Sequence, residues 1–255
     1  MSILSGFADI SLWQLAMVAA VALVASLVGG VAGYGTGALM PLVLVPLVGA
    51  APVVPIIAIS SLFTNSSRVA AFFSHADWRR AGIVLVCAAP FCALSAWGYT
   101  KLTSAGAALV IGAMLILSVP LRRLLRHRGV TLNDRGLAVG AAGYGVVVGG
   151  TAGSGVILLT LLMAAGVEGA AVIATDGAVS IVIGLAKMSV FGVMGAVDAR
   201  VIAFALLIGI VALPGAFLAR AFVARMPVHV HAAILDAVVI VGGLFLVADA
   251  LRGLR

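Results

Sequence analysis

The chain has few charged residues. Only 9% of its 255 residues are Asp, Glu, Lys or Arg, whereas 64% are hydrophobic and the mean hydropathy is +1.30. A soluble domain carries about 25% charged residues, so this composition excludes a water-covered globular surface and indicates a membrane protein. The net charge of +7 does not indicate nucleic-acid binding, because that function needs a basic face in polar surroundings.

Metal ligands and disulfide partners are also scarce. The two cysteines, Cys87 and Cys92, lie in one apolar segment without a histidine nearby, and we expect both to be small buried hydrophobic residues. The four histidines fall at predicted loops or helix ends, and none stands at ligand spacing from a cysteine or glutamate. The sequence therefore predicts no metal site, and no cofactor is expected.

Long apolar runs, by contrast, fill the chain. Runs of about 20 residues are long enough for membrane-spanning helices and predict an all-α polytopic protein. Two segments would be about 57 and 46 Å long as straight helices, well beyond a hydrocarbon core of about 30 Å, so each is expected to be broken. The segments cover residues 12–49, 52–75, 80–100, 104–121, 136–166, 168–192, 199–223 and 228–251, and the first and fifth are the long ones.

The two long segments carry the same glycine-rich motif. Residues 28–35 (VGGVAGYG) recur as residues 148–155 (VGGTAGSG), with six of eight positions identical. A duplicated, glycine-interrupted apolar segment is typical of a secondary transporter that binds substrate where its two halves meet. Because non-helical backbone inside a membrane must be buried in protein or line a wet cavity, both breaks are expected to meet at the centre.

The repeat predicts two homologous transmembrane units, residues 1–121 and 136–255. The basic linker between them, residues 122–135, is expected in the cytoplasm under the positive-inside rule. If each broken segment crosses once, the protein has eight spans; if each crosses twice, it has ten spans in two inverted halves. The charge distribution slightly favours eight spans and transporter architecture favours ten, so both remain open.

Two cations fall inside predicted spans. On the repeat alignment Lys187 lies opposite Ser67 and Arg68 lies opposite Met188, one residue from equivalence. A lone charge at the bilayer centre costs roughly 3 kcal/mol and normally faces a partner or a cavity. We therefore expect Arg68 and Lys187 to counter the charge of one central anion. The alternative for Arg68 is that it snorkels to the membrane interface.

Asp176 is interpreted as a lone carboxylate within a span. It lies about 16 Å along a helix from Lys187, which is too far for a direct ion pair. An intramembrane carboxylate is a candidate for proton coupling. A carboxylate near the start of a helix can also be held by the helix dipole without any role in transport, and both interpretations stay open.

The glycine breaks can supply the rest of an anion site. Where a new half-helix starts, its backbone N–H groups are free and the dipole favours negative charge. The alternative is close helix packing through small residues, which needs no ligand. In addition to the two cations, the predicted substrate-binding residues are Thr36, Asn65, Ser154, Gly33, Gly35, Gly153 and Gly155.

These motifs resemble the TauE/SafE family of sulfite and organosulfonate exporters. The similar features are the glycine-rich broken helix (29–35), a Ser/Asn-bearing helix (59–66) and a short turn (76–78), with second copies at 149–155, 174–176 and 196–198. The chain departs from the family pattern in its second copy, which lacks the expected proline and carries Asp176 and Lys187 where mostly small or apolar residues are expected.

The resemblance implies a multi-pass protein of the bacterial inner membrane that is not an enzyme. Its expected activity is transport, chiefly export, of small sulfur-containing anions by proton-coupled alternating access. The expected partners are a small anionic substrate and the lipid bilayer, with a homodimer as one expected assembly and no nucleic acid.

Two other functions are considered. A passive anion channel would share the same site but could not drive flux uphill. An intramembrane hydrolase would use Ser154 as nucleophile, since the Gly153-Ser154-Gly155 run resembles a nucleophile turn, but activating that serine needs a histidine at membrane depth, and every histidine is peripheral in the sequence.

Overall fold

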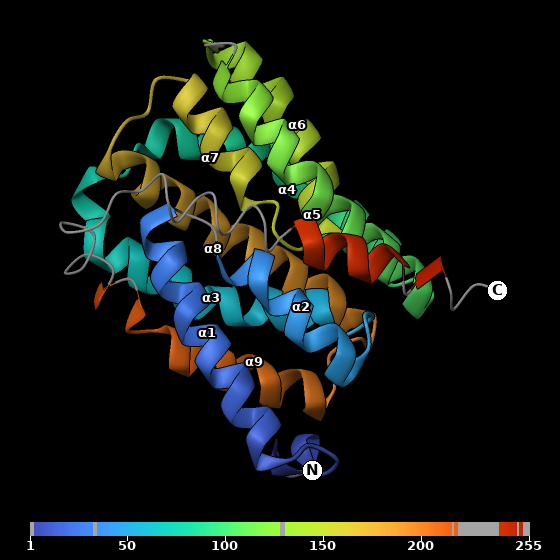
Figure 1. The fold of residues 1–255 in the computed structure, drawn as a ribbon. Coiled ribbons are helices and arrows are strands. Elements are labelled where there is room, and N and C mark those ends of the chain that lie inside the picture. Colours follow the sequence, from blue (N-terminus) through green and yellow to red (C-terminus); the bar gives the residue numbers. More distant parts are fainter. Residues whose placement is uncertain are drawn as a thin grey trace.

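The computed structural model describes residues 3–32, 35–127, 131–215, 217–218, 240–248 and 250–251. All regular structure in these residues is helical, which confirms the all-α class (Figure 1). Residues 240–248 and 250–251 are helical as well. The other elements are η1 (Ile3–Phe7), α1 (Leu12–Ala32), α2 (Thr36–Val48), α3 (Val53–Phe72), η2 (Phe73–His75), α4 (Trp78–Tyr99), α5 (Ser104–His127), α6 (Asp134–Gly149), α7 (Gly155–Ala164), α8 (Ala170–Val193) and α9 (Ala199–Ala212).

Several of these helices can cross a membrane. Four stretches are long and apolar enough to do so: Leu12–Gly29, Val53–His75, Trp78–Tyr99 and Ala170–Val193. Shorter apolar helices accompany them, including α2, α7 and α9. This pattern supports a multi-pass membrane protein. Most of the predicted segment 228–251 lies outside the described residues.

In both long segments the helix stops at the glycine motif. α1 ends at Ala32 and α2 begins at Thr36, while α6 ends at Gly149 and α7 begins at Gly155. Between α6 and α7, Gly153 has a φ of +82°, a conformation that side-chain-bearing residues rarely adopt. α2 has 13 residues and α7 has 10, so they are only about 20 and 15 Å long and shorter than the hydrocarbon core.

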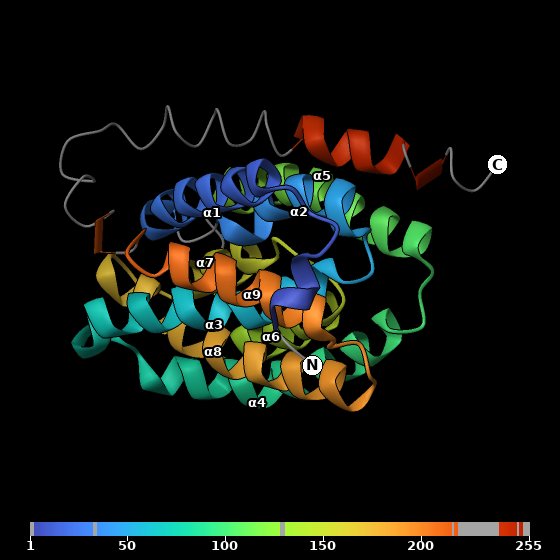
Figure 2. The ribbon, with the colours of Figure 1, turned by 90° about the horizontal axis from the view of Figure 1, so that it is seen from below.

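Helices α3 and α8 form the centre of the bundle and run antiparallel. Arg68, near the end of α3, contacts Asp176, near the start of α8. At the other end of the contact, a Cβ added at Gly184 of α8 would lie 3.4 Å from the carbonyl oxygen of Ala58 of α3. Figure 2 shows α1 and α2 on one side of this pair and α4 on the other.

Each half of the chain places one helix in the core of the other half. α4 packs on α6 and α8, and α9 packs on α1 and α3. One apolar core accordingly combines α4 with α6, α7 and α8, whereas the other combines α9 with α1, α2, α3 and α5 and also includes the ends of α4 and α8. The two halves therefore cannot be separated without exposing both cores.

Two ion pairs connect the start of one helix with the start of another, or with the segment just before it. Arg79 at the start of α4 pairs with Asp134 at the start of α6, and Arg200 at the start of α9 lies 2.9 Å from Asp9, which precedes α1. α4 starts where α3 ends, and α9 starts where α8 ends. Because α3 and α8 are antiparallel, α1 and α6 begin at opposite faces of the bundle and run in opposite directions.

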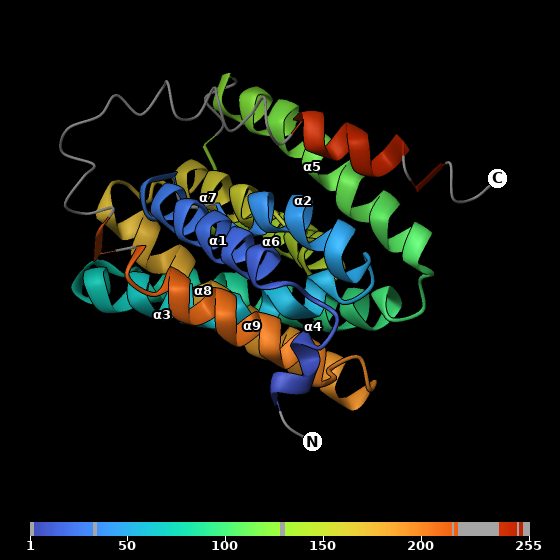
Figure 3. The ribbon, with the colours of Figure 1, turned by 60° about the horizontal axis from the view of Figure 1, so that its bottom comes forward.

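The helical residues 240–248 lie beside α5 (Figure 3). A Cβ added at Gly243 would come within 3.0 Å of the carbonyl oxygen of Gly112. Small residues let two membrane helices approach backbone to backbone, so these two glycines fix the contact between α5 and the last described helix.

A similar close approach joins α4 and α6. A Cβ added at Gly145 would lie 2.3 Å from the carbonyl oxygen of Ala88, and one at Gly149 would lie 2.1 Å from that of Cys92. Gly149 therefore serves helix packing, while Gly153 and Gly155 belong to the break itself.

This contact makes Gly145 sensitive to substitution. Gly145→Ala should destabilise the folded protein by about 1–3 kcal/mol, because the added methyl group forces α4 and α6 apart, and should lower the melting temperature by about 2–12 °C. The matched control is Gly143→Ala on the exposed face of the same helix, where an added Cβ meets nothing within 4 Å. It should leave stability unchanged or raise it by up to about 1 kcal/mol; equal melting temperatures for both variants would contradict the packing argument.

Candidate functional site

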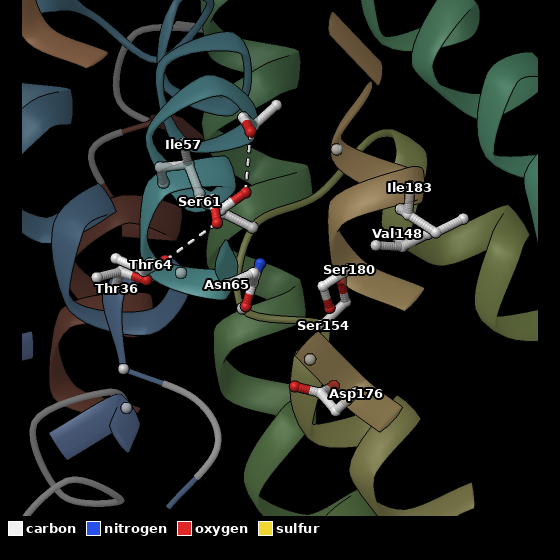
Figure 4. A pocket seen from close by; sticks show the side chains of 18 of the residues that line it. Thr36, Ile57, Ser61, Thr64, Asn65, Val148, Ser154, Asp176, Ser180 and Ile183 are labelled. Carbon is white, nitrogen blue, oxygen red and sulfur yellow. Dashed lines mark hydrogen bonds between the residues drawn. The ribbon is translucent and has the colours of Figure 1, made fainter. Parts of the chain in front are cut away.

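A cavity of about 120 Å³ lies between the two broken segments and the α3–α8 pair. Figure 4 shows Thr36 and Asn65 on one side of it and Ser154, Asp176 and Ser180 on the other. The polar residues that line it are Ser26, Thr36, Ser61, Thr64, Asn65, Ser67, Arg68, Tyr144, Thr151, Ser154, Asp176, Ser180 and Lys187.

The two breaks meet at this cavity. A Cβ added at Gly37, in the first turn of α2, would lie 2.9 Å from the backbone nitrogen of Gly153 in the α6–α7 connection. The residues at the helix starts, Gly35 for α2 and Ser154 for α7, make no side-chain capping hydrogen bond. The positive ends of two half-helices therefore face one small volume, which favours an anion there.

The structure brings nearly all of the predicted site residues to this one cavity. Gly33 lies outside the described residues. The others that line the cavity are Gly35, Thr36, Asn65, Arg68, Gly153, Ser154, Gly155, Asp176 and Lys187.

Arg68 and Asp176 form a buried ion pair across the two halves. Arg68 Nη2 lies 2.7 Å from Asp176 Oδ2, and the side chains are 9% and 1% exposed. Arg68 Nη1 also donates to Asn65 Oδ1 at 3.0 Å. The interpretation of Asp176 as a lone carboxylate is therefore wrong, because the antiparallel crossing of α3 and α8 joins residues 108 positions apart. The burial of Arg68 also rules out snorkelling.

This pair leaves one donor and one acceptor unused. Arg68 Nε and Asp176 Oδ1 are buried and have no hydrogen-bond partner among the described residues. Buried polar atoms nearly always have a partner, and leaving one unsatisfied costs about 1–3 kcal/mol. A ligand that offers an acceptor to Nε and a donor to Oδ1 would satisfy both atoms.

Lys187 approaches the cavity from the other end of α8. Its Nζ donates to the carbonyl oxygens of Val148 at 2.8 Å and Thr151 at 3.2 Å, and the residue is 6% exposed. Since Arg68 and Asp176 neutralise each other, the described lining residues carry a net charge of one positive unit, that of Lys187. This charge suits a monoanion.

Comparison with models of known protein families assigns the chain to one family. The family model for the sulfite exporter TauE/SafE matches residues 18–246, nearly the whole chain. The chain belongs to the TauE/SafE family. The resemblance seen in the motifs is thereby confirmed, and with it an exporter-type membrane transporter as the class of protein. No curated protein and no solved structure matches the chain.

The short turns of the TauE/SafE pattern have a structural role. Asp77 Oδ1 accepts the backbone N–H of Arg80 at 3.0 Å, and Asp198 Oδ1 accepts that of Val201 at 2.8 Å. They are the N-caps of α4 and α9, a position at which aspartate is strongly preferred. The hydrogen bond from the Arg80 N–H is the main reason that the pKa of Asp77 is lowered.

Within the described part of this TauE/SafE protein, no group of three or more His, Cys, Asp or Glu side chains is placed to hold a metal ion. Among the described residues that line the cavity there is no histidine, so none of them can act as a general base for Ser154 in the way an imidazole would.

Proposed function

We propose that this TauE/SafE protein exports small sulfur-containing anions, such as sulfite or organosulfonates, across the bacterial inner membrane by proton-coupled alternating access. One observation carries the proposal. The cavity between the two halves holds a net positive charge together with an unused donor on Arg68 and an unused acceptor on Asp176.

The geometry suggests how an anion would be held. Lys187 supplies the uncompensated charge, and Arg68 Nε offers a hydrogen bond to an oxygen of the substrate. Thr36, Asn65 and Ser154 line the same volume, so their polar groups and the N–H groups at the starts of α2 and α7 would bind the remaining oxygens. A protonated oxyanion such as hydrogen sulfite carries the O–H that Asp176 Oδ1 can accept, which links the substrate to proton transfer.

We also propose that the two halves are inverted repeats with ten spans. Support comes from the opposite directions of α1 and α6 and from the antiparallel crossing of α3 with α8. Because α3 and α8 are antiparallel, α3 starts at the face of the bundle where α8 ends. α1 starts at that same face, since Asp9 pairs with Arg200 directly after α8. The chain therefore crosses and returns between Leu12 and Val53, as two segments rather than one. Rocking of one half against the other about α3 and α8 would expose the cavity alternately to each side.

Ligand binding tests the proposal directly. The melting temperature of the purified protein should rise selectively with one of the sulfur compounds sulfite, sulfoacetate, taurine, thiosulfate and sulfate, and should not rise with acetate. A ligand at 100 times its Kd stabilises the folded state by about 2.7 kcal/mol, or about 5–10 °C for a protein of this size.

Lys187→Gln is the informative variant. Glutamine keeps an N–H donor for the carbonyl oxygens of Val148 and Thr151 but removes the charge, so the protein should stay folded while the ligand-induced shift and saturable transport are abolished. Wild-type transport by a folded Lys187→Gln protein would contradict the role of this lysine. No shift of the wild-type protein with any of the five sulfur compounds, or a shift with acetate alone, would contradict the substrate class.

A further inference from the structure

Lys187 does more than add charge to the cavity, because its Nζ also donates hydrogen bonds to backbone carbonyl oxygens at the end of α6. The last carbonyl groups of a helix have no partner within the helix, and inside a membrane no bulk water satisfies them. α6 ends at Gly149, so its last carbonyl oxygens need donors from elsewhere.

Side chains provide two of those donors. Thr151 Oγ1 donates to the carbonyl oxygen of Val147 at 2.6 Å, and Lys187 Nζ donates to that of Val148 at 2.8 Å. Lys187 Nζ alone serves two oxygens, those of Val148 and Thr151. Its ammonium group is thus coordinated by backbone carbonyl oxygens from both sides of the point where the helix breaks.

Carbonyl oxygens at the end of an unwound helix are the ligands with which membrane transporters bind sodium and similar ions. Such oxygens carry partial negative charge from the helix dipole and suit a hard monovalent cation. In this chain the same kind of oxygen cluster holds a primary ammonium group that is covalently part of α8.

We propose that Lys187 is a tethered cation that occupies a monovalent-cation site formed by the carbonyl oxygens of Val148 and Thr151. The wild-type protein then needs no sodium or potassium ion for folding or transport, and removal of the amine opens the site to a free monovalent cation. The inference deepens the proposed function by naming the group that fills a site of the kind that binds sodium in other transporters, but this site does not depend on the identity of the substrate.

The site belongs to the second half of the chain. On the repeat alignment Ser67 stands where the second half has Lys187, and its hydroxyl donates to the carbonyl oxygen of Thr64 within α3 at 2.8 Å. Ser67 therefore contributes no positive charge, and the two halves differ chemically at this position.

Cation-dependent stability of variants tests the proposal. Wild type, Lys187→Ala and Lys187→Met are purified, and melting temperatures are measured in choline, sodium, potassium and methylammonium chloride at one ionic strength. The wild-type midpoint should be the same in all four salts. Lys187→Ala should be less stable in choline and should regain about 5–10 °C, in a saturable manner, at 100 times the Kd of the ion that fits.

Two controls separate a specific site from a general salt effect. Lys187→Met fills the same space without charge and should respond to no cation. Lys101→Ala removes the other lysine of the chain, which is exposed and lies with Nζ 5.7 Å from the centre of the Trp97 ring; it too should behave as wild type in every salt.

If Lys187→Ala does not yield folded protein, Lys187→Thr provides the same test, because its hydroxyl adds an oxygen beside the two carbonyl groups. A folded Lys187→Ala or Lys187→Thr protein with one midpoint in all four salts would overturn the proposal. A cation response without any sulfur-anion response in the wild type would support the cation site and contradict the proposed function, whereas the reverse pattern would contradict the cation site alone.

Discussion

Arg68→Met should destabilise the folded protein by about 3–5 kcal/mol, because it leaves the carboxylate of Asp176 buried without its charge partner. For a chain of this length that loss lowers the melting temperature by about 6–20 °C. Transport should be lost as well, since Arg68 lines the cavity and its unused Nε donor disappears together with the guanidinium group.

The double variant Arg68→Met/Asp176→Leu separates stability from function. Replacement of both members of a buried ion pair by apolar side chains is often neutral or stabilising, so the melting temperature should return to near the wild-type value while transport stays absent. Thermal melts of the three proteins in one detergent, followed by flux in proteoliposomes, give the comparison. Restored transport in the double variant would show that the pair is only structural.

Asp176→Asn should uncouple transport from the proton gradient. Asparagine retains the shape and a weaker acceptor for Arg68 but cannot carry a proton between the two sides. If one proton moves with each anion, a gradient of one pH unit supports about tenfold accumulation, equivalent to about 1.4 kcal/mol. The variant should lose this accumulation and keep downhill anion flux.

The control for this measurement is Asp134→Asn. Asp134 also pairs with an arginine, Arg79, but both side chains are exposed at the helix starts, where an ion pair contributes about 0–1 kcal/mol. It should accumulate substrate as wild type does. Unchanged pH-driven accumulation by Asp176→Asn would exclude this carboxylate from coupling, and a wild-type protein that cannot accumulate substrate would be a passive channel.

Apolar run lengths were enough to predict the helical class, and each of the two longest runs is divided between two helices, α1 with α2 and α6 with α7. A segment of 38 or 31 residues cannot be one straight span, and the glycine motif marks the place where each helix ends. The cavity-lining residues were likewise predictable, because polar side chains and cations are too costly at membrane depth to lie anywhere except against protein or a cavity.

The partners of those residues were not predictable from linear spacing. Along its own helix the nearest cation to Asp176 is Lys187, about 16 Å away, whereas its partner is Arg68 on α3. One signal was present: in an inverted repeat the equivalent second helices cross antiparallel, so a residue near the end of one meets a residue near the start of the other. That inference required the direction of the repeats, which the charge distribution left open.

The sequence by itself determined the membrane class, the helical fold and the TauE/SafE family, since these depend on composition, length and local motifs. The tertiary structure alone decided that Arg68 is neutralised by Asp176, that Lys187 binds the carbonyl oxygens of Val148 and Thr151 at the end of α6, and that α3 and α8 run antiparallel. The physical reason is that a charge inside a membrane is controlled by whichever group lies within about 3–4 Å, and contacts at that range are made by helix crossings between residues far apart in the chain.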